Sequence, residues 1–167
     1  MIVDLENIIR KLTPNLLRYC MARTRDRNLA EEIAQESLVA LIMRLNNRGV
    51  PESAQAFLFA VARRKAARML LRRRMLLPLQ ILAGNRDHSP DPEEAALHRE
   101  GLSQMVRALE QLPACDREAL LIVAVGGLRI SEATQVLGIS ESALKMRILR
   151  ARQRLHSLME DGNEIKK

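Results

Sequence analysis

Apolar positions along this chain recur at helical spacing and show none of the strict alternation of a half-buried strand. In the segment 29–45, steps of four, three and four residues place one set of side chains on a single helix face. These are Ala34, Leu38, Leu41 and Leu45. The segment 53–74 shows a second helical pattern, whose expected core positions are Phe57, Leu58, Val61, Ala62, Ala66, Met69 and Leu70. A third pattern follows Ser140, with Leu144, Ile148, Ala151 and Leu155 on one stripe. The chain is therefore predicted to be all-α.

The clearest turn in the chain separates the short segment 131–137 from the helix that follows Ser140. The Ser140 hydroxyl can accept a hydrogen bond from an orphan amide of the first helical turn, which makes it a good N-cap. Gly138 supplies the permissive backbone that a sharp turn between helices requires. Two helices joined in this way, the first one short, predict a helix-turn-helix unit that binds DNA.

The second helix of this unit is strongly basic. It carries Lys145, Arg147, Arg150, Arg152 and Arg154, and no acidic residue lies between Ser142 and Met159. Such a helix suits a phosphate-lined groove, although a solvated helix of an ordinary bundle is the alternative. Side chains near its start and opposite the core stripe are placed to reach base edges: Glu141, Ser142, Lys145, Met146 and Leu149. The capping residue Ser140 is also expected at the DNA interface. Phosphate contacts are expected from Arg129, Arg147, Arg150 and Arg154.

A second cationic surface lies on the helix predicted for 53–74. Seven basic residues occur within twelve positions, with no acid among them. Like charges at this density repel one another unless anions are close, and nucleic acid is the natural counter-charge. An anionic membrane surface or simple solubility is the alternative. The expected nucleic-acid contacts are Arg63, Arg64, Lys65, Arg68, Arg72 and Arg73.

The helix predicted for 29–45 also has a second, outward stripe. It is acidic at its start and apolar at its end, and consists of Glu32, Gln35, Glu36, Val39 and Met43. A mixed stripe suits docking on the helices of another protein, and the alternative is an ordinary solvated face with two exposed apolar residues.

Composition and charge divide the 167 residues into two basic parts around an acidic middle. Residues 1–76 carry a net charge of +8, residues 77–112 carry −3, and residues 113–167 carry +2. Turn formers and prolines between 84 and 92 predict a flexible or extended linker over 77–92, after which a helix restarts near Asp91 or Pro92 and ends before Pro113. The expected architecture is two small helical bundles, 1–76 and 93–162, with a tail at 163–167.

Other classes of protein find little support. No apolar run approaches the roughly 18 residues of a membrane span, and no secretory leader is visible, so we expect a cytoplasmic protein without membrane insertion. Cys20, Cys115 and three histidines show no metal-ligand spacing. We expect no catalytic constellation, no metal, no cofactor and no small-molecule substrate.

These motifs together resemble the extracytoplasmic-function (ECF, group IV) sigma factors of the sigma-70 family. Residues 30–36 and 56–63, which run into the arginine cluster, are similar to sigma region 2. Leu112-Pro113, Arg117-Glu118, the turn 137–140 and the segment 150–155 are similar to region 4. The resemblance spans about 10–76 and 92–160. It differs in its scarcity of aromatic residues in the promoter-melting part, where the family commonly has several.

The resemblance implies a bacterial initiation factor with three working surfaces. The outward stripe Glu32, Gln35, Glu36 and Val39 would bind core RNA polymerase. The arginine-rich helix and the loop 46–55 would engage melted promoter DNA near the start site. The helix that begins after Ser140 would lie in the major groove of the upstream (minus thirty-five) element. Family members are commonly held inactive by an anti-sigma factor, so such a partner is implied as well.

Two other functions remain open at the level of sequence. One is a sigma-like mimic that sequesters an anti-sigma regulator and never engages promoter DNA. The other is a stand-alone helix-turn-helix regulator that binds duplex DNA tightly without polymerase.

Overall fold

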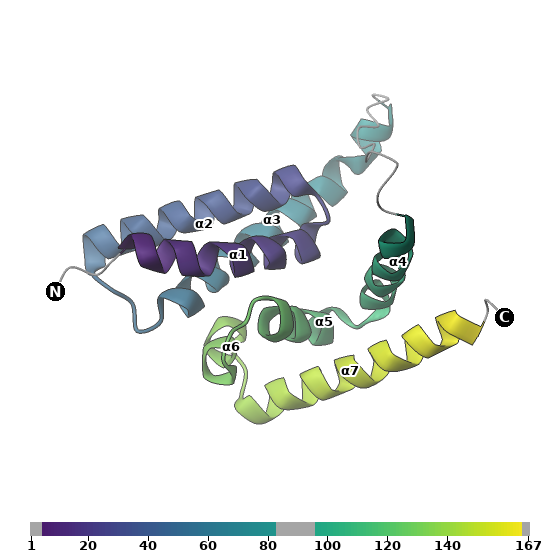
Figure 1. The fold of residues 1–167 in the computed structure, drawn as a ribbon. Helices are drawn as coiled ribbons and strands as arrows, with labels where there is room; N and C mark the ends of the chain where they lie inside the picture. Colours follow the sequence, from purple (N-terminus) through teal and green to yellow (C-terminus); the bar gives the residue numbers. More distant parts are fainter. Residues whose placement is uncertain (1–4, 83–95, 165–167) are drawn as a thin grey trace.

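The protein is a chain of helices, shown in Figure 1, and the computed structural model describes residues 5–82 and 96–164. In these ranges every regular element is helical, which confirms the all-α prediction. The elements are α1 (Leu5–Thr24), α2 (Arg27–Arg48), α3 (Ala54–Leu82), α4 (Ala96–Gln111), α5 (Ala114–Leu120), the π-helix η1 (Leu121–Val125), α6 (Ile130–Leu137) and α7 (Glu141–Glu164).

Helices α1, α2 and α3 form the first bundle. Asp26 caps α2, because its Oδ1 accepts a hydrogen bond of 3.0 Å from the Leu29 amide. The core of the bundle contains Leu16, Ile33, Leu41 and Leu58, all fully buried. The stripe predicted to face inward on α2 does so: Ala34 and Leu41 are buried, and Leu38 and Leu45 are half-buried against the core.

The second bundle contains α4, α5, η1, α6 and α7, and its helix-turn-helix has the predicted geometry. Gly138 adopts a left-handed conformation (φ 65°, ψ 36°) and its amide donates to the Thr134 carbonyl, which ends α6. The Ser140 hydroxyl accepts a hydrogen bond of 3.2 Å from the Ala143 amide and thereby caps α7. Leu144, Ile148 and Ala151 are buried, as the spacing of the α7 stripe predicts.

The boundaries of the linker differ from the expectation. Helix α3 continues to Leu82, so an extended conformation is wrong for residues 77–82. Pro78 lies inside this stretch and removes one backbone hydrogen bond of the helix, but the leucines, glutamine and isoleucine around it have adequate helix propensity, and the run of turn formers begins only at Gly84. The remainder of the predicted linker and the helix start expected near Asp91 lie outside the described residues, and α4 is described from Ala96.

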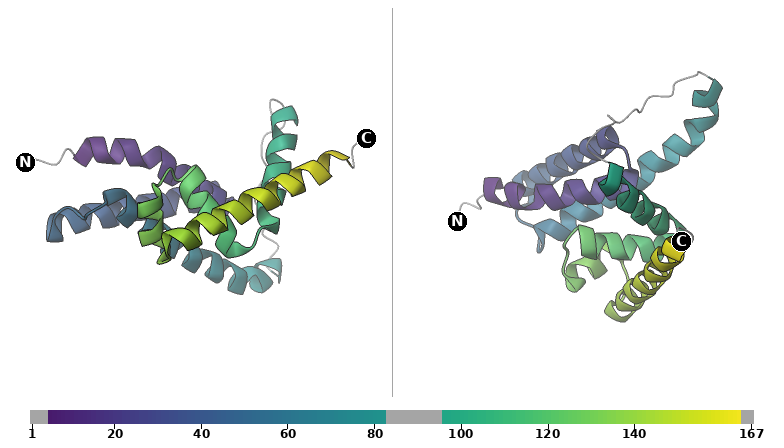
Figure 2. Two further views of the ribbon diagram at one scale, coloured as in Figure 1. Left: turned by 90° about the horizontal axis from the view of Figure 1, so that it is seen from below. Right: turned by 45° about the vertical axis from the view of Figure 1, so that its right-hand side comes forward.

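The two bundles pack against each other and share one hydrophobic core. Helix α1 packs on η1, and α3 packs on α6. Figure 2 shows the green helices of the second bundle lying against the purple and blue helices of the first. At the centre of this contact Phe59 is fully buried, and its ring centroid lies 5.4 Å from that of Tyr19. Gly126 permits the close approach, because a Cβ atom added there would lie 2.6 Å from Cε1 of Phe59.

Gly126→Ala therefore tests the contact between the bundles. The added methyl group would also lie 2.6 Å from the Ile122 carbonyl oxygen, so the surroundings must shift. We expect a loss of about 1–3 kcal/mol in the free energy of unfolding, measured by urea denaturation. Ala124→Ser, at an exposed neighbouring position, serves as the control and should change stability by no more than about 0.5 kcal/mol. Equal stability of both variants would contradict the observed packing.

Candidate nucleic-acid interface

The first half of α7 presents an outward face free of packing. Glu141, Ser142 and Lys145 are exposed, and Met146 and Leu149 are 50% and 48% exposed. The residues predicted to reach base edges therefore lie together on one side of the helix. Among the predicted phosphate contacts, Arg154 is exposed and Arg147 is half-buried. The face begins at the capped turn, so the cap of Ser140 sets the position of its first residues.

Arg150 has a partner that sequence reasoning missed. Its Nε and Nη2 atoms donate hydrogen bonds of 3.2 and 3.0 Å to the two carboxylate oxygens of Asp116, a buried residue of α5. The pKa of Arg150 is raised by these hydrogen bonds and by the charge of Asp116. The expectation that no acid neutralises the basic residues of α7 is thus wrong for Arg150, because the acid comes from a different helix. The pair ties α7 to α5.

Arg129, at the start of α6, is paired within its own turn. Its Nη2 atom lies 3.1 Å from Oε1 of Glu132, and its backbone amide donates to Oε2 at 3.0 Å. Burial raises the pKa of Glu132, but the hydrogen bonds from Arg129 and Ser53 outweigh it, and the pKa is lowered overall. Ser53 belongs to the loop before α3, so Glu132 also connects the two bundles through a hydrogen bond of 2.8 Å.

The arginine-rich helix α3 is partly neutralised by acids from other elements. Lys65 pairs with Glu36, Arg73 pairs with Asp26 at 2.9 Å, and Arg63 Nε lies 4.0 Å from Glu118. Three of these cations therefore have an acid of the chain itself as a counter-charge, where the sequence suggested nucleic acid. Arg64, Arg68, Arg72 and Arg74 are exposed and form no ion pair within the described part of the chain. Three of these, at 64, 68 and 72, make the line that the spacing predicted.

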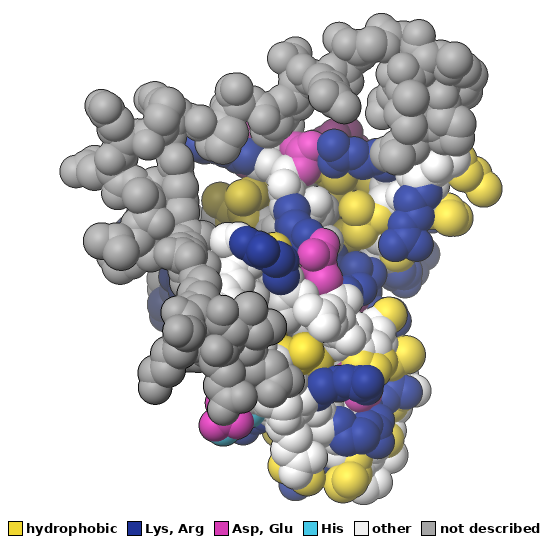
Figure 3. Space-filling view, turned by 90° about the vertical axis from the view of Figure 1, so that its right-hand side faces the viewer, with side chains coloured by type: hydrophobic (Ala, Val, Ile, Leu, Met, Phe, Trp, Pro, Cys, Tyr) yellow, Lys and Arg dark blue, Asp and Glu magenta, His cyan; other side chains and the backbone are white. Residues whose placement is uncertain are grey.

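The outward stripe of α2 is also exposed as predicted. Glu32, Gln35 and Glu36 are exposed, and Val39 and Met43 are 49% and 58% exposed. Because Glu36 pairs with Lys65, this stripe borders the arginine-rich surface of α3. Figure 3 shows, on one side of the molecule, basic side chains covering more of the visible surface than acidic ones, with hydrophobic side chains between them.

A buried carboxylate, that of Glu118, connects the two bundles, and the sequence did not predict this contact. Tyr19 Oη donates a hydrogen bond of 2.5 Å to Oε1 of Glu118, and Arg23 Nε lies 2.7 Å from Oε2. Glu118 is 7% exposed and Tyr19 is fully buried. Nearby, Gln55 Nε2 donates to the carbonyl oxygens of Gly126 and Gly127 at 3.4 Å. We call the contacts among Tyr19, Arg23, Arg63 and Glu118 the Glu118 joint.

A helix-turn-helix and a separate arginine-lined helix on one all-α chain define a DNA-binding protein of transcription. Family models for "Sigma-70 region 2" and "Sigma-70, region 4" match residues 8–75 and 102–155. The chain is 32% identical to the ECF RNA polymerase sigma factor ShbA of Streptomyces griseus, over 92% of this chain and 86% of that protein. It is 31% identical to the ECF RNA polymerase sigma factor SigD of Mycobacterium tuberculosis, over 90% and 74%.

The chain therefore belongs to the ECF sigma factors, which bind core RNA polymerase and direct promoter-specific initiation of transcription. Two solved structures share its fold. The sigma factor RpoE from Bartonella quintana, in complex with the anti-sigma factor NepR, matches with a TM-score of 0.70 and 23% identity over 94% of this chain and 97% of that one. CnrH in complex with the cytosolic domain of CnrY matches with a TM-score of 0.68 and 22% identity over 94% and 88%.

Residues 5–82 and 96–164 contain neither a metal-binding cluster nor a membrane-spanning helix. No group of three or more histidine, cysteine or acidic side chains there could hold a metal ion. No helix in those ranges combines the length and apolarity needed to cross a membrane.

The Glu118 joint predicts how the single tyrosine titrates. Burial is the main cause that raises the pKa of Tyr19 well above 10.0, and the charge and hydrogen bond of Glu118 raise it further. Because the pKa of Tyr19 is higher in the folded chain than in the unfolded chain, its contribution to stability is fully present below the unfolded-state pKa. That contribution is lost as the pH rises through the folded-state pKa. We therefore expect tyrosinate absorbance in native protein to appear only together with loss of helical circular dichroism. Titration in concentrated urea, where Tyr19 should ionise near its ordinary pKa of about 10, is the control. Ionisation near that pH with intact helices would contradict the buried contact.

Proposed function

We propose that the three exposed surfaces divide the work of initiation among them. The outward face of α7 reads the upstream duplex element, the line Arg64, Arg68 and Arg72 contacts melted promoter DNA, and the stripe of α2 binds core polymerase. The observation that supports this most strongly is that the three surfaces are exposed together on one compact chain. Since polymerase and promoter lie in the cytoplasm of a bacterium, we place the protein there.

On α7 we propose that base contacts come from Glu141, Ser142, Lys145, Met146 and Leu149. Lys145 Nζ lies 2.5 Å from Glu141 Oε1, and both side chains are 60% exposed, so this weak surface pair can be exchanged for contacts with base edges. Arg129, Arg147 and Arg154 supply phosphate contacts. Arg150 acts as a positioning residue, because its Nε and Nη2 atoms both donate to Asp116 and thereby hold α7 against α5.

On α3 we propose that electrostatics carry most of the contact with melted DNA. Aromatic stacking commonly contributes about 1–3 kcal/mol per unpaired base. Tyr19 and Phe59 are fully buried, which leaves only the half-buried Phe57 as an aromatic residue at the surface. The unpaired arginines at 64, 68 and 72 can bind strand phosphates directly. Arg63, Lys65 and Arg73 can join them when their acidic partners are displaced.

The closed arrangement must open for the two DNA surfaces to act together. The minus thirty-five element and the melted DNA near the start site are separated by many base pairs, and a duplex rises about 3.4 Å per base pair. In the structure α6, which supports the recognition helix, packs directly on α3. We therefore propose that the bundles separate at the Glu118 joint when the chain engages polymerase and promoter.

An anti-sigma factor is a further partner that we propose. The two structures of similar fold are titled as complexes with NepR and with the cytosolic domain of CnrY, and the NepR title names an anti-sigma factor. Val39 and Met43 are exposed apolar residues beside the acidic stripe of α2. A helix of an anti-sigma factor could pack on these two side chains. It would then cover the surface that we propose binds polymerase.

The first test is run-off transcription by purified chain with core polymerase. A sigma factor yields promoter-dependent transcripts, whereas a mimic that only sequesters a regulator yields none. A mobility-shift comparison adds the second distinction, since a stand-alone regulator binds the duplex equally well without core enzyme.

Charge reversal separates the surfaces of α2 and α3. We expect Arg64→Glu, Arg68→Glu and Arg72→Glu together to abolish initiation and to leave affinity for core polymerase unchanged. Val39→Asp should weaken binding to core polymerase, because it places a charge on an apolar contact. Lys11→Glu, an exposed change of the same sign on α1, is the control. Unchanged transcription by the triple variant would overturn the role of α3.

Base readers and phosphate contacts on α7 differ in how they respond to sequence. Lys145→Ala should cost on the order of 1–3 kcal/mol at one base position and relax specificity there. Arg154→Ala should weaken all promoters alike and lower the salt dependence of binding by about one unit of slope. Both effects are measured with a panel of single-base promoter variants bound by the holoenzyme, with Lys11→Ala as a charge-matched control. A uniform loss in both α7 variants would refute the division.

A further inference from the structure

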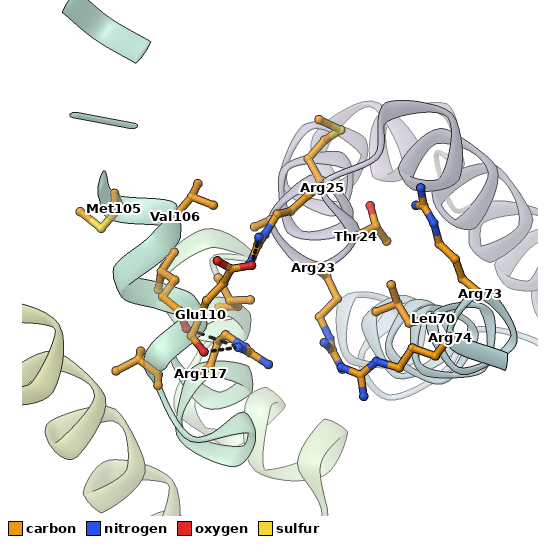
Figure 4. Close-up of a pocket in the computed structure, with 15 residues that line it drawn as sticks. Arg23, Thr24, Arg25, Leu70, Arg73, Arg74, Met105, Val106, Glu110 and Arg117 are labelled. Carbon is orange, nitrogen blue, oxygen red and sulfur yellow. Dashed lines mark hydrogen bonds and ion pairs between the residues drawn. The ribbon is translucent and has the colours of Figure 1, made fainter. Parts of the chain in front are cut away.

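A cavity of about 1040 Å³ lies between the two bundles, away from the DNA-reading face of α7. Its walls are the end of α1, the part of α3 around Leu70, and residues of α4, α5 and η1, as Figure 4 shows. Both bundles therefore contribute to one cavity, and it exists in this form only while they are packed together. Sites for small organic ligands commonly have about 300–1,000 Å³, so the cavity is large enough for one.

Five arginines line this cavity, and acids neutralise three of them. Arg25 pairs with Glu110, Arg73 with Asp26 and Arg23 with Glu118. The pairing of Arg23 is imperfect, since its buried Nε atom lies close to Glu118 but has no hydrogen bond of acceptable geometry among the described residues. The remaining two are Arg74 and Arg117.

Arg74 and Arg117 leave positive charge without a matching acid. Arg74 forms no ion pair within the described ranges, and Figure 4 shows its side chain and that of Arg23 pointing toward one another. The Arg117 side chain donates to the Leu109 and Glu110 carbonyl oxygens at 3.5 and 3.1 Å. Burial lowers the pKa of Arg117, and the charges of Arg23 and Arg25 lower it further. The cavity therefore has a positive potential that a bound anion would relieve.

Apart from Thr24 and Glu110, the rest of the lining is apolar. Leu70 comes from α3, Met105, Val106 and Leu109 come from α4, and Leu121 comes from η1. A bare inorganic anion would leave these side chains uncovered, whereas an anion with a flat organic part would cover them. Guanidinium groups bind phosphate through paired, charge-assisted hydrogen bonds. A carboxylate can accept the same paired bonds, but it has fewer oxygens than a phosphate chain.

We propose that this cavity binds a nucleoside polyphosphate, with the phosphates on Arg23, Arg74 and Arg117 and the base against the apolar wall. A ligand that contacts both bundles binds the closed form alone, so it stabilises that form by mass action. The consequence for transcription rests on the proposed function, because it requires that the chain open to engage a promoter. The binding itself does not depend on it.

The experiment measures binding to the full chain by isothermal titration calorimetry and by thermal unfolding, without divalent cations. The probes are ATP, inorganic tripolyphosphate and adenosine. We expect ATP to bind and to raise the unfolding temperature, tripolyphosphate to bind about tenfold more weakly because it lacks the apolar part, and adenosine to leave both readouts unchanged.

Variants distinguish the cavity from the basic surface as a whole. Arg74→Gln and Met105→Asp, both at exposed positions that line the cavity, should each weaken ATP binding at least tenfold. Arg72→Gln, an exposed arginine of the same helix outside the lining, is the matched control and should bind as the parent chain does. Equal weakening by Arg72→Gln and Arg74→Gln would show non-specific attraction and overturn the proposal, as would absence of ATP binding at millimolar concentration. Neither result would bear on the proposed function, which the run-off transcription assay tests separately.

Discussion

The closed structure depends on one buried carboxylate at the point where the two bundles meet. An ionised carboxylate loses its hydration on burial, and it is tolerated only when hydrogen bonds and opposite charges replace the lost water. Glu118 receives the Tyr19 hydroxyl on one oxygen and the Arg23 guanidinium beside the other. Both partners belong to α1, so the first bundle supplies what the second bundle's acid requires.

The apolar contact of Phe59 with Gly126 and the hydrogen bond of Ser53 with Glu132 flank this joint. If either Glu118 or its partners on α1 are removed, a buried polar group is left unpaired. The stability of each bundle therefore depends on its contact with the other.

The same physics sorts the many cations of this chain into internal and external ones. Arg150, Arg63, Lys65 and Arg73 each face an acid from a different element, and these contacts hold helices together. Arg64, Arg68 and Arg72 have no such partner in the described ranges and remain exposed. An arginine with a satisfied carboxylate gains less from a phosphate than one without, because the existing pair must first be broken. The cations left unpaired by folding are therefore the better candidates for nucleic acid.

Because the chain is an ECF sigma factor, the division of its cations into paired and unpaired ones bears on how it binds its partners. A factor of this kind binds core polymerase and promoter DNA, and the three surfaces that we propose for this work are exposed while the bundles are packed on each other. The packing that protects the shared core also keeps the recognition helix near the arginine-rich helix. If the bundles separate as proposed, the stability of the free chain and its reach along a promoter are opposed, because the contacts of Glu118 with α1 must then be lost.

Local physical chemistry made much of this protein readable from its sequence. The helices follow from periodic apolar positions, and the recognition unit follows from Gly138 in a left-handed turn and Ser140 as a cap, both of which act within a few residues. The exposed residues of α7 and the line at 64, 68 and 72 follow from the same periodicity, because an amphipathic helix has one solvent-facing side.

Only the tertiary structure decided which partners these faces would meet. Tyr19 and Glu118 are 99 positions apart, and Asp116 and Arg150 are 34 apart, so no periodicity in one helix relates them. The end of α3 also lay beyond sequence reasoning, since Pro78 disfavours a helix whereas the leucines, glutamine and isoleucine around it at 77–82 allow one, and their surroundings decide the outcome. A helical pattern determines which side of a helix is apolar, but the position of a neighbouring helix determines which charge is buried, which is paired and which is left for DNA.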